Sequence, residues 1–126
     1  MKKIKPFNGK TTCFICDVSD REDVRKKLEL VKKEIGQIDN LINYSGIVSG
    51  KSFLENSGQE IGKNFFVNIV AIFGETRALF PEMVDKNCRH IITDASVSGI
   101  IITPRLIDYL SSKFADFGFD ESVCSN

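Results

Sequence analysis

Tyr109 and Lys113 stand four residues apart near the end of the chain, in the segment YLSSK. In a helix this spacing places both side chains on one face. A lysine ammonium there would favour the tyrosine phenolate, and such a tyrosine is suited to exchanging a proton with a hydroxyl group. The spacing alone is weak, because two unrelated polar residues on a solvated helix face also produce it. The surrounding residues must therefore show whether Tyr109 and Lys113 form a catalytic pair.

Other polar residues accompany this pair in places where a site would need them. Ser96 follows the apolar segment HIITDA, ahead of Tyr109 in the chain. Asn68 interrupts the apolar stretch FFVNIV, where an amide requires a hydrogen-bond partner. The remaining candidates stand where two earlier apolar segments end, and they are Asp17, Val18, Asn43, Ser45 and Gly46.

Short apolar segments alternate with helical ones along the chain. The segments rich in strand-forming residues predict three strands, at Thr11–Val18, Asn40–Asn43 and His90–Ala95. Apolar residues at helical spacing predict three helices, from Ser19 to Gly36, from about Glu60 to Lys86 and from Ile107 to Glu121.

Local signals refine the first two helices. Ser19 followed by Glu22 predicts a capping box at the start of the first helix, and Gly36 predicts its end. In the second helix, Pro81 predicts a bend just before it.

Strands joined by helices of this length predict β-α-β units and an α/β fold with a doubly wound parallel sheet. The 126 residues suit one domain. In such sheets the chemistry lies in the loops beyond the carboxyl ends of the strands. Those loops here are 17–19, 43–52 and 95–109, which hold most of the candidates.

Composition excludes several other classes of protein. Seventeen basic residues balance 17 acidic ones, whereas a nucleic-acid binder needs a basic excess. No apolar run approaches the roughly 18 residues that span a bilayer, and the first residues lack the apolar stretch of a signal peptide. Cys13 and Cys16 form a C-x-x-C, but residues three apart on a strand face opposite sides, which argues against a redox or zinc site. Cys88 and His90 have no second ligand pair, so no metal is expected.

Taken together, these motifs resemble in order and spacing the short-chain dehydrogenases/reductases. The segments CDVSDREDV, GKSFL, LFPEMV and YLSSKFADFGF are most similar to the retinol and 17β-hydroxysteroid dehydrogenase branch, including the epidermal retinol dehydrogenases. The resemblance extends from about Lys10 to Glu121. It implies a partial Rossmann-type sheet in a single, incomplete NAD(P)-binding domain over residues 1–126.

The resemblance also implies a role for each candidate. Tyr109 would be the general acid/base, Lys113 would hold the nicotinamide ribose and support the phenolate, and Ser96 would hydrogen-bond the substrate oxygen. Asn68 would kink the long helix and hold a water in the proton relay. The cofactor-binding residues would be Asp17 and Val18 at the adenine, and Asn43, Ser45 and Gly46 in the cofactor loop.

The implied activity is hydride transfer between NAD or NADP and a small lipophilic alcohol or ketone, a retinoid or a steroid. The sequence leaves NAD and NADP open, because the residue that reads the ribose 2′ position follows a strand that is absent here. Dimers would form through the helices Glu60–Lys86 and Ile107–Glu121. The chain as written is expected in the cytoplasm, whereas intact relatives are expected at the endoplasmic reticulum membrane or on lipid droplets.

Departures from the family support an alternative interpretation. The sequence contains no T-G-x-x-x-G-x-G turn for the pyrophosphate. In the family's sheet, two further strands lie side by side between the strands that correspond to Thr11–Val18 and Asn40–Asn43, and this sequence contains neither of them. Unusual residues for the family stand at Tyr44, Arg89, Asp94, Arg105 and Asp116. The alternative is a non-catalytic remnant, a pseudoenzyme or pseudogene product, that at most associates with intact relatives. A third reading is an unrelated α/β binding domain.

Overall fold

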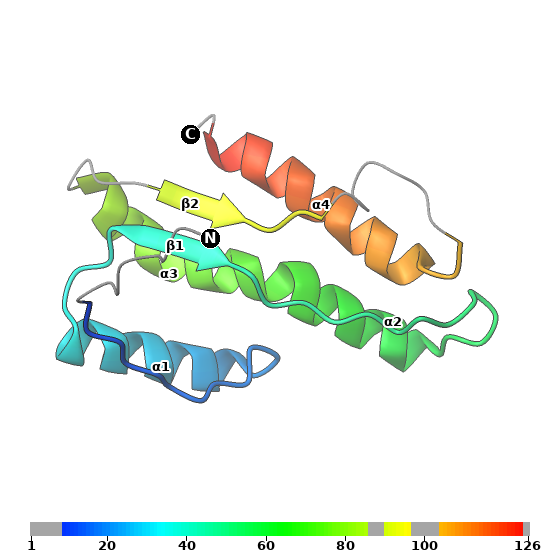
Figure 1. Ribbon diagram of the computed structural model, residues 1–126, viewed down its shortest axis with the longest axis horizontal. Helices are drawn as coiled ribbons and strands as arrows, with labels where there is room; N and C mark the ends of the chain where they lie inside the picture. The colour runs from blue at the N-terminus through cyan, green and yellow to red at the C-terminus, as the bar shows by residue number, and fades with distance from the viewer. Residues whose placement is uncertain (1–8, 86–89, 97–103, 125–126) are drawn as a thin grey trace, which may run out of the picture.

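The computed structural model describes residues 9–85, 90–96 and 104–124. Its elements follow one another as α1 (Arg21–Glu34), β1 (Asn40–Asn43), α2 (Gly58–Phe65), η1 (Phe66–Val70), α3 (Ala71–Asp85), β2 (His90–Thr93) and α4 (Ile107–Cys124) (Figure 1). The elements α2, η1 and α3 follow without a break, so they form one long helix that contains a π-helical turn.

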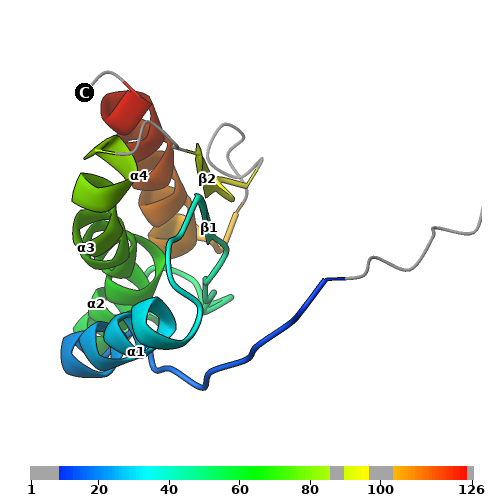
Figure 2. The same cartoon turned by 90° about the vertical axis from the view of Figure 1, so that its left-hand side faces the viewer.

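The strands β1 and β2 pair in parallel, with Asn40 opposite His90 and Asn43 opposite Thr93. One further bond, from the Asp94 N–H to the Asn43 carbonyl at 3.0 Å, extends the ladder past the end of β2. Parallel strands require a long crossover, and the α2–η1–α3 helix supplies it. Figure 2 shows the helices gathered on one side of this sheet. The predicted α/β architecture with a parallel sheet is confirmed.

The predicted strand Thr11–Val18 is not formed. This segment has no strand hydrogen bonds, and Figure 2 shows the described part of it running away from β1 and β2. A strand exists only where a neighbour offers backbone donors and acceptors. Among the described residues, β1 and β2 pair only with each other, and neither pairs with this segment.

The predicted end of α1 at Gly36 is confirmed, whereas the predicted cap at Ser19 is wrong. Its cap is Asp20, whose side chain accepts hydrogen bonds from the N–H groups of Glu22 and Asp23. Ser19, the predicted cap, instead donates both its N–H and its hydroxyl to Asp17. The Asp20 carboxylate thus accepts from the first N–H groups of the helix, which have no partner within the helix. Its negative charge also interacts favourably with the positive end of the helix dipole, which the Ser19 hydroxyl cannot do. Gly36 has φ 95°, a left-handed conformation that ends the helix as predicted.

The long helix contains one irregular turn and continues past its proline, and the predicted bend before Pro81 stays a prediction. Helix α3 runs through Pro81 to Asp85. The π-helical turn lies at η1, around Asn68, where the family resemblance implied a kink. Lys86, Cys88 and Arg89 lie outside the described residues.

The core lies between the long helix and α4. Its buried centre is Ile69, Ile72 and Phe119, against which Phe65, Val70, Ala115 and Val123 pack. Helix α4 is thereby held along η1, which also positions the polar residues described below.

The sheet has one covered and one bare face among the described residues. Leu41 and Ile91 are half-buried on the helix side, whereas their neighbours Ile42 and Ile92 are 61% and 51% exposed. Because side chains alternate along a strand, Ile42 and Ile92 share the face opposite the helices. This bare apolar patch favours self-association.

Lysine substitutions in β1 test the assignment of the two faces. Ile42→Lys should change the free energy of unfolding by less than about 0.5 kcal/mol and raise the monomer fraction, since the side chain already meets water. Leu41→Lys should destabilise by about 2 kcal/mol or more, because its charge would be forced against the helices. Urea denaturation with sedimentation velocity measures both. Equal destabilisation by the two variants would contradict the assignment.

Candidate functional site

The predicted site residues gather at one end of the molecule. Both strand arrows point toward the end where α2 and α4 begin (Figure 1). This arrangement follows from parallel strands joined by helices, which carry the loops after β1 and β2 to the same edge. The loop after β1 holds Ser45 and Gly46, and Ser96 follows β2.

Asn68 lies at the centre of this arrangement and is fully buried. Its side-chain oxygen accepts a hydrogen bond from the Ile47 N–H at 2.8 Å. Its side-chain nitrogen lies 3.0 Å from the Ile47 carbonyl and 2.9 Å from the Ser112 hydroxyl. One amide therefore joins the loop after β1 to helix α4.

Asn64 completes this network one turn earlier in α2. Its side-chain nitrogen donates to the Ile47 carbonyl at 3.1 Å, and its oxygen lies 3.0 Å from the nitrogen of Asn68. Asn64 and Ser112 were not among the predicted site residues. The spacing of four residues between Asn64 and Asn68 was the available signal, because it places both amides on one helix face.

Lys113 is buried, although lysine is a long and strongly hydrated cation. Its Nζ donates to the Asp94 carbonyl at 2.9 Å and to the Asp116 carboxylate at 2.8 Å. It also stands 5.8 Å from the ring centroid of Tyr109, which is half-buried on the same helix. The predicted pair is thus brought together, with the ammonium fixed against the end of the sheet.

Residues at the ends of β1 and β2 hold the backbone that the Lys113 ammonium contacts. Asn43 is buried, and its side-chain nitrogen lies 3.5 Å from the Thr93 hydroxyl across the ladder. The same Asn43 holds Asp94 through the backbone bond given above, so the carbonyl that meets Lys113 is set by the strand register. Ser96 follows two residues later with φ 55°, a left-handed conformation that turns the chain sharply out of the strand.

Gly46 leaves open space beside the two central polar residues. A Cβ atom at this position would lie 3.7 Å from the Asn68 oxygen and 3.9 Å from the Lys113 Nζ. These are ordinary contact distances, so alanine would fit and a larger side chain would meet both groups. The neighbouring Ser45 is exposed.

Asp17 and Val18 lie in the turn before α1. The Asp17 carboxylate accepts hydrogen bonds from the Ser19 hydroxyl at 2.6 Å and from its N–H at 2.9 Å, and these bonds lower the pKa of Asp17. The Asp17 N–H donates to the carboxylate of Asp23. In this structure Asp17 therefore shapes the entry to α1, and its adenine contact stays a prediction.

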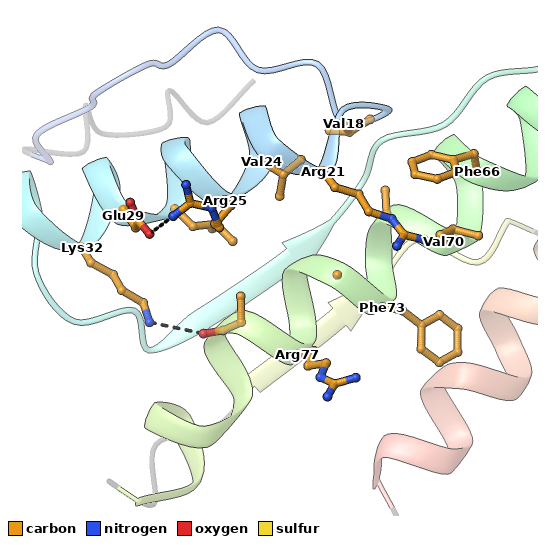
Figure 3. A pocket seen from close by; sticks show the side chains of 14 residues that line it. Val18, Arg21, Val24, Arg25, Glu29, Lys32, Phe66, Val70, Phe73 and Arg77 are labelled. Atoms are coloured by element: carbon orange, nitrogen blue, oxygen red, sulfur yellow. Dashed lines mark hydrogen bonds and ion pairs between the residues drawn. The ribbon is translucent and has the colours of Figure 1, made fainter.

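One cavity among the described residues lies away from this site. It is a groove of about 580 Å³ between α1 and the η1–α3 part of the long helix (Figure 3). Its floor is apolar, and Arg21 lies 5.5 Å above the ring of Phe66 at one side. Of the predicted site residues only Val18 lines it. The groove is therefore separate from the Tyr109–Lys113 pair, neither of which lines it.

Two further features of the described residues concern metal-ligating side chains and helix hydropathy. Within those ranges no three histidine, cysteine or acidic side chains are grouped to hold a metal ion. Cys13 and Cys16 are free thiols, and they do not lie on a strand as their interpretation assumed. None of the described helices has the length and apolar character to cross a bilayer.

Comparisons with known proteins agree with this geometry. The sequence profile of the short chain dehydrogenase family matches residues 1–126. Retinol dehydrogenase 10-B of Danio rerio is 42% identical over 123 residues, covering 98% of this chain and 37% of that protein. The 17-beta-hydroxysteroid dehydrogenase 13 of Homo sapiens is 42% identical over 112 residues, covering 89% of this chain and 37% of that protein.

Solved structures show the same relation. The structure of 4-hydroxyisoleucine dehydrogenase complexed with NADH has a TM-score of 0.80 at 28% identity, covering 86% of this chain and 48% of that chain. The ligand-free aldohexose dehydrogenase of Thermoplasma acidophilum has a TM-score of 0.79 at 28% identity, covering 87% and 43%. The chain belongs to the short-chain dehydrogenase/reductase family, within the branch of retinol and 17β-hydroxysteroid dehydrogenases. It spans less than half the length of these relatives.

The residues present fit the nicotinamide ribose of a nicotinamide dinucleotide, but not its pyrophosphate. An ammonium has three N–H donors, and Lys113 uses two of them on Asp94 and Asp116, which leaves one for a ribose hydroxyl. Gly46 leaves room beside that donor. No described residue supplies the glycine-rich turn that would receive the pyrophosphate.

Replacing Asn68 tests the network that holds the site. Asn68→Ala should lower the free energy of unfolding by about 2–4 kcal/mol, because the fully buried amide would be lost together with its hydrogen bonds to Ile47, Asn64 and Ser112. Ser111→Ala is the matched control. Its exposed hydroxyl bonds only the Ile107 carbonyl, so the loss should stay below about 0.5 kcal/mol. Chemical denaturation measures both, and equal effects would show that Asn68 does not organise this region.

Proposed function

We propose that this chain carries the proton-transfer half of an NAD- or NADP-dependent oxidoreductase that acts on a retinoid or steroid alcohol or ketone. The observation that carries the proposal is the Lys113 ammonium fixed beside Tyr109 at the carboxyl end of a parallel sheet. Membership of the family supports the reaction type. The substrate class rests on relatives that are named retinol and 17-beta-hydroxysteroid dehydrogenases.

Each residue would contribute a separate physical effect. The Tyr109 hydroxyl would exchange a proton with the substrate oxygen, and Ser96 would donate a hydrogen bond to that oxygen as its charge develops. Lys113 would hold the nicotinamide ribose. Asn68 would keep the Ile47 loop in place and hold a water of the proton relay. The dinucleotide supplies the hydride chemistry when bound.

A chimera tests the proposal in a complete protein. The segment of human 17-beta-hydroxysteroid dehydrogenase 13 that matches this chain is replaced by residues of this chain, and turnover of retinol and estradiol is measured with NAD and NADP. Tyr109→Phe in the chimera should lower kcat by about a hundredfold or more while cofactor affinity changes little, because only the proton donor is lost.

One control variant makes this result specific. Ser111→Ala, exposed on the same helix, should leave turnover unchanged. A parent chimera without turnover, or a Tyr109→Phe variant with undiminished turnover, would contradict the proposed catalytic role.

A non-catalytic role in association is the second candidate. Phe73 on α3 and Phe114 and Phe117 on α4 remain 47–55% exposed, on the two helices predicted to form dimers. Large apolar side chains of this kind favour a partner surface.

Cofactor titration of the 126-residue chain separates the two candidates. The chain by itself should show no useful affinity for NAD(H) or NADP(H) by isothermal titration calorimetry, since the site that would neutralise the pyrophosphate is lacking. A dissociation constant in the low micromolar range would contradict this expectation. It would also favour the catalytic candidate for the chain in isolation.

A further inference from the structure

Asp116 is fully buried in α4 and binds the ammonium of Lys113. The Nζ–Oδ2 distance is 2.8 Å, and the two side chains are 7% and 0% exposed. Burial raises the pKa of the Asp116 carboxyl, and the adjacent Lys113 opposes that shift. A pair at this depth is screened far less by solvent than a surface ion pair.

The pair changes what Lys113 presents to Tyr109. A lone ammonium 5.8 Å from the tyrosine ring would favour the phenolate. A carboxylate in direct contact with the same ammonium turns the cation into a neutral pair. At the same time, the contacts to Asp116 and to the Asp94 carbonyl hold the Nζ from two sides.

We propose that Asp116 is a positioning residue for Lys113: its carboxylate fixes the ammonium and cancels much of the positive charge that would otherwise support the Tyr109 phenolate. The catalytic meaning of this inference rests on the proposed function. In a working enzyme the reaction through Tyr109 would be displaced toward alkaline pH by Asp116.

Two other acidic side chains, Asp108 and Asp94, lie close to this pair in the chain or in space. Asp108, buried beside Tyr109 in the chain, has no hydrogen-bond partner for either oxygen among the described residues, and its negative charge would also disfavour the phenolate. The exposed Asp94 carboxylate follows β2 and acts on Asp116.

The elements packed against α4 also carry ionisable side chains. Helix α3, whose Phe73 contacts Phe119 of α4, contributes the half-buried Glu75 and also Arg77, Glu82 and Asp85. The turn η1 contains no titratable side chain, and β2 contributes only His90. From α2 come Glu60, which pairs with Lys51, and the exposed Lys63. Among these groups, Asp116 is the one whose carboxylate directly contacts the Lys113 ammonium.

The ionisation of Tyr109 can be measured directly in the 126-residue chain. The chain has two tyrosines and no tryptophan, so in a Tyr44→Phe background the ultraviolet absorbance of the phenolate reports Tyr109 alone. Three proteins are compared in that background: the unchanged site, Asp116→Asn, and the double variant Lys113→Met with Asp116→Leu. Circular dichroism at each pH verifies the fold.

The proposal predicts how the titration midpoint of Tyr109 in each of the two variants differs from that in the unchanged site. Asp116→Asn should lower the titration midpoint of Tyr109 by about 0.5–1 pH unit, because the lysine charge is no longer cancelled. The double variant should titrate within about 0.3 pH unit of the unchanged site, since a neutral pair and two apolar residues exert similar fields. Asp120→Asn, one turn further along α4, is the control and should leave the midpoint unchanged.

Two results would overturn the proposal. One is a midpoint in the unchanged site well below that of the double variant, which would mean that Lys113 acts as an uncancelled cation. The other is a folded Asp116→Asn variant whose midpoint does not fall. Should Asp116→Asn fail to fold, the first comparison decides alone, because apolar replacement of a buried ion pair commonly preserves folding. The titration needs no cofactor or substrate, so its outcome is independent of turnover in the chimera.

Discussion

The buried amide of Asn68 is the constraint on which the rest of this structure depends. It contacts Ile47, 21 residues earlier in the chain, and Ser112, 44 residues later. A buried amide is costly unless its donors and acceptor are paired, so the loop after β1 and helix α4 must be positioned together. The π-helical turn at η1 presents the Asn68 side chain to both. Irregular helical turns of this kind are frequent at functional sites.

The second constraint is the register of the two strands. Pairing Asn43 with Thr93 places Asp94 just beyond the ladder, where its N–H is held by Asn43 and its carbonyl meets Lys113. The position of the lysine ammonium therefore depends on backbone hydrogen bonds as well as on its own helix. A slip of one residue would turn the strand over and remove this contact.

Much of the fold follows from local signals. The bounds of β1 and the starts of β2 and α4 agree with those predicted, because strand-forming clusters and helical periodicity dominate there. The segment Thr11–Val18 has the same apolar character, yet it forms no strand, since pairing depends on neighbours that composition does not report. At the start of α1, Ser19 and Asp20 are both good caps, and the geometry of the preceding turn at Asp17 selected Asp20.

The sequence by itself determined the β-α-β order, the family and the spacing that brings Tyr109 and Lys113 to one helix face, because these depend on short-range periodicity and motif order. Only the tertiary structure decided the partner of each polar side chain. Asp116 is an unusual charge in the sequence, but its pairing with Lys113 and its complete burial depend on α4 packing against η1. The roles of Asn64 and Ser112 likewise arise from contacts across helices. Such contacts depend on how helices pack, and neither residue type nor local spacing specifies that packing.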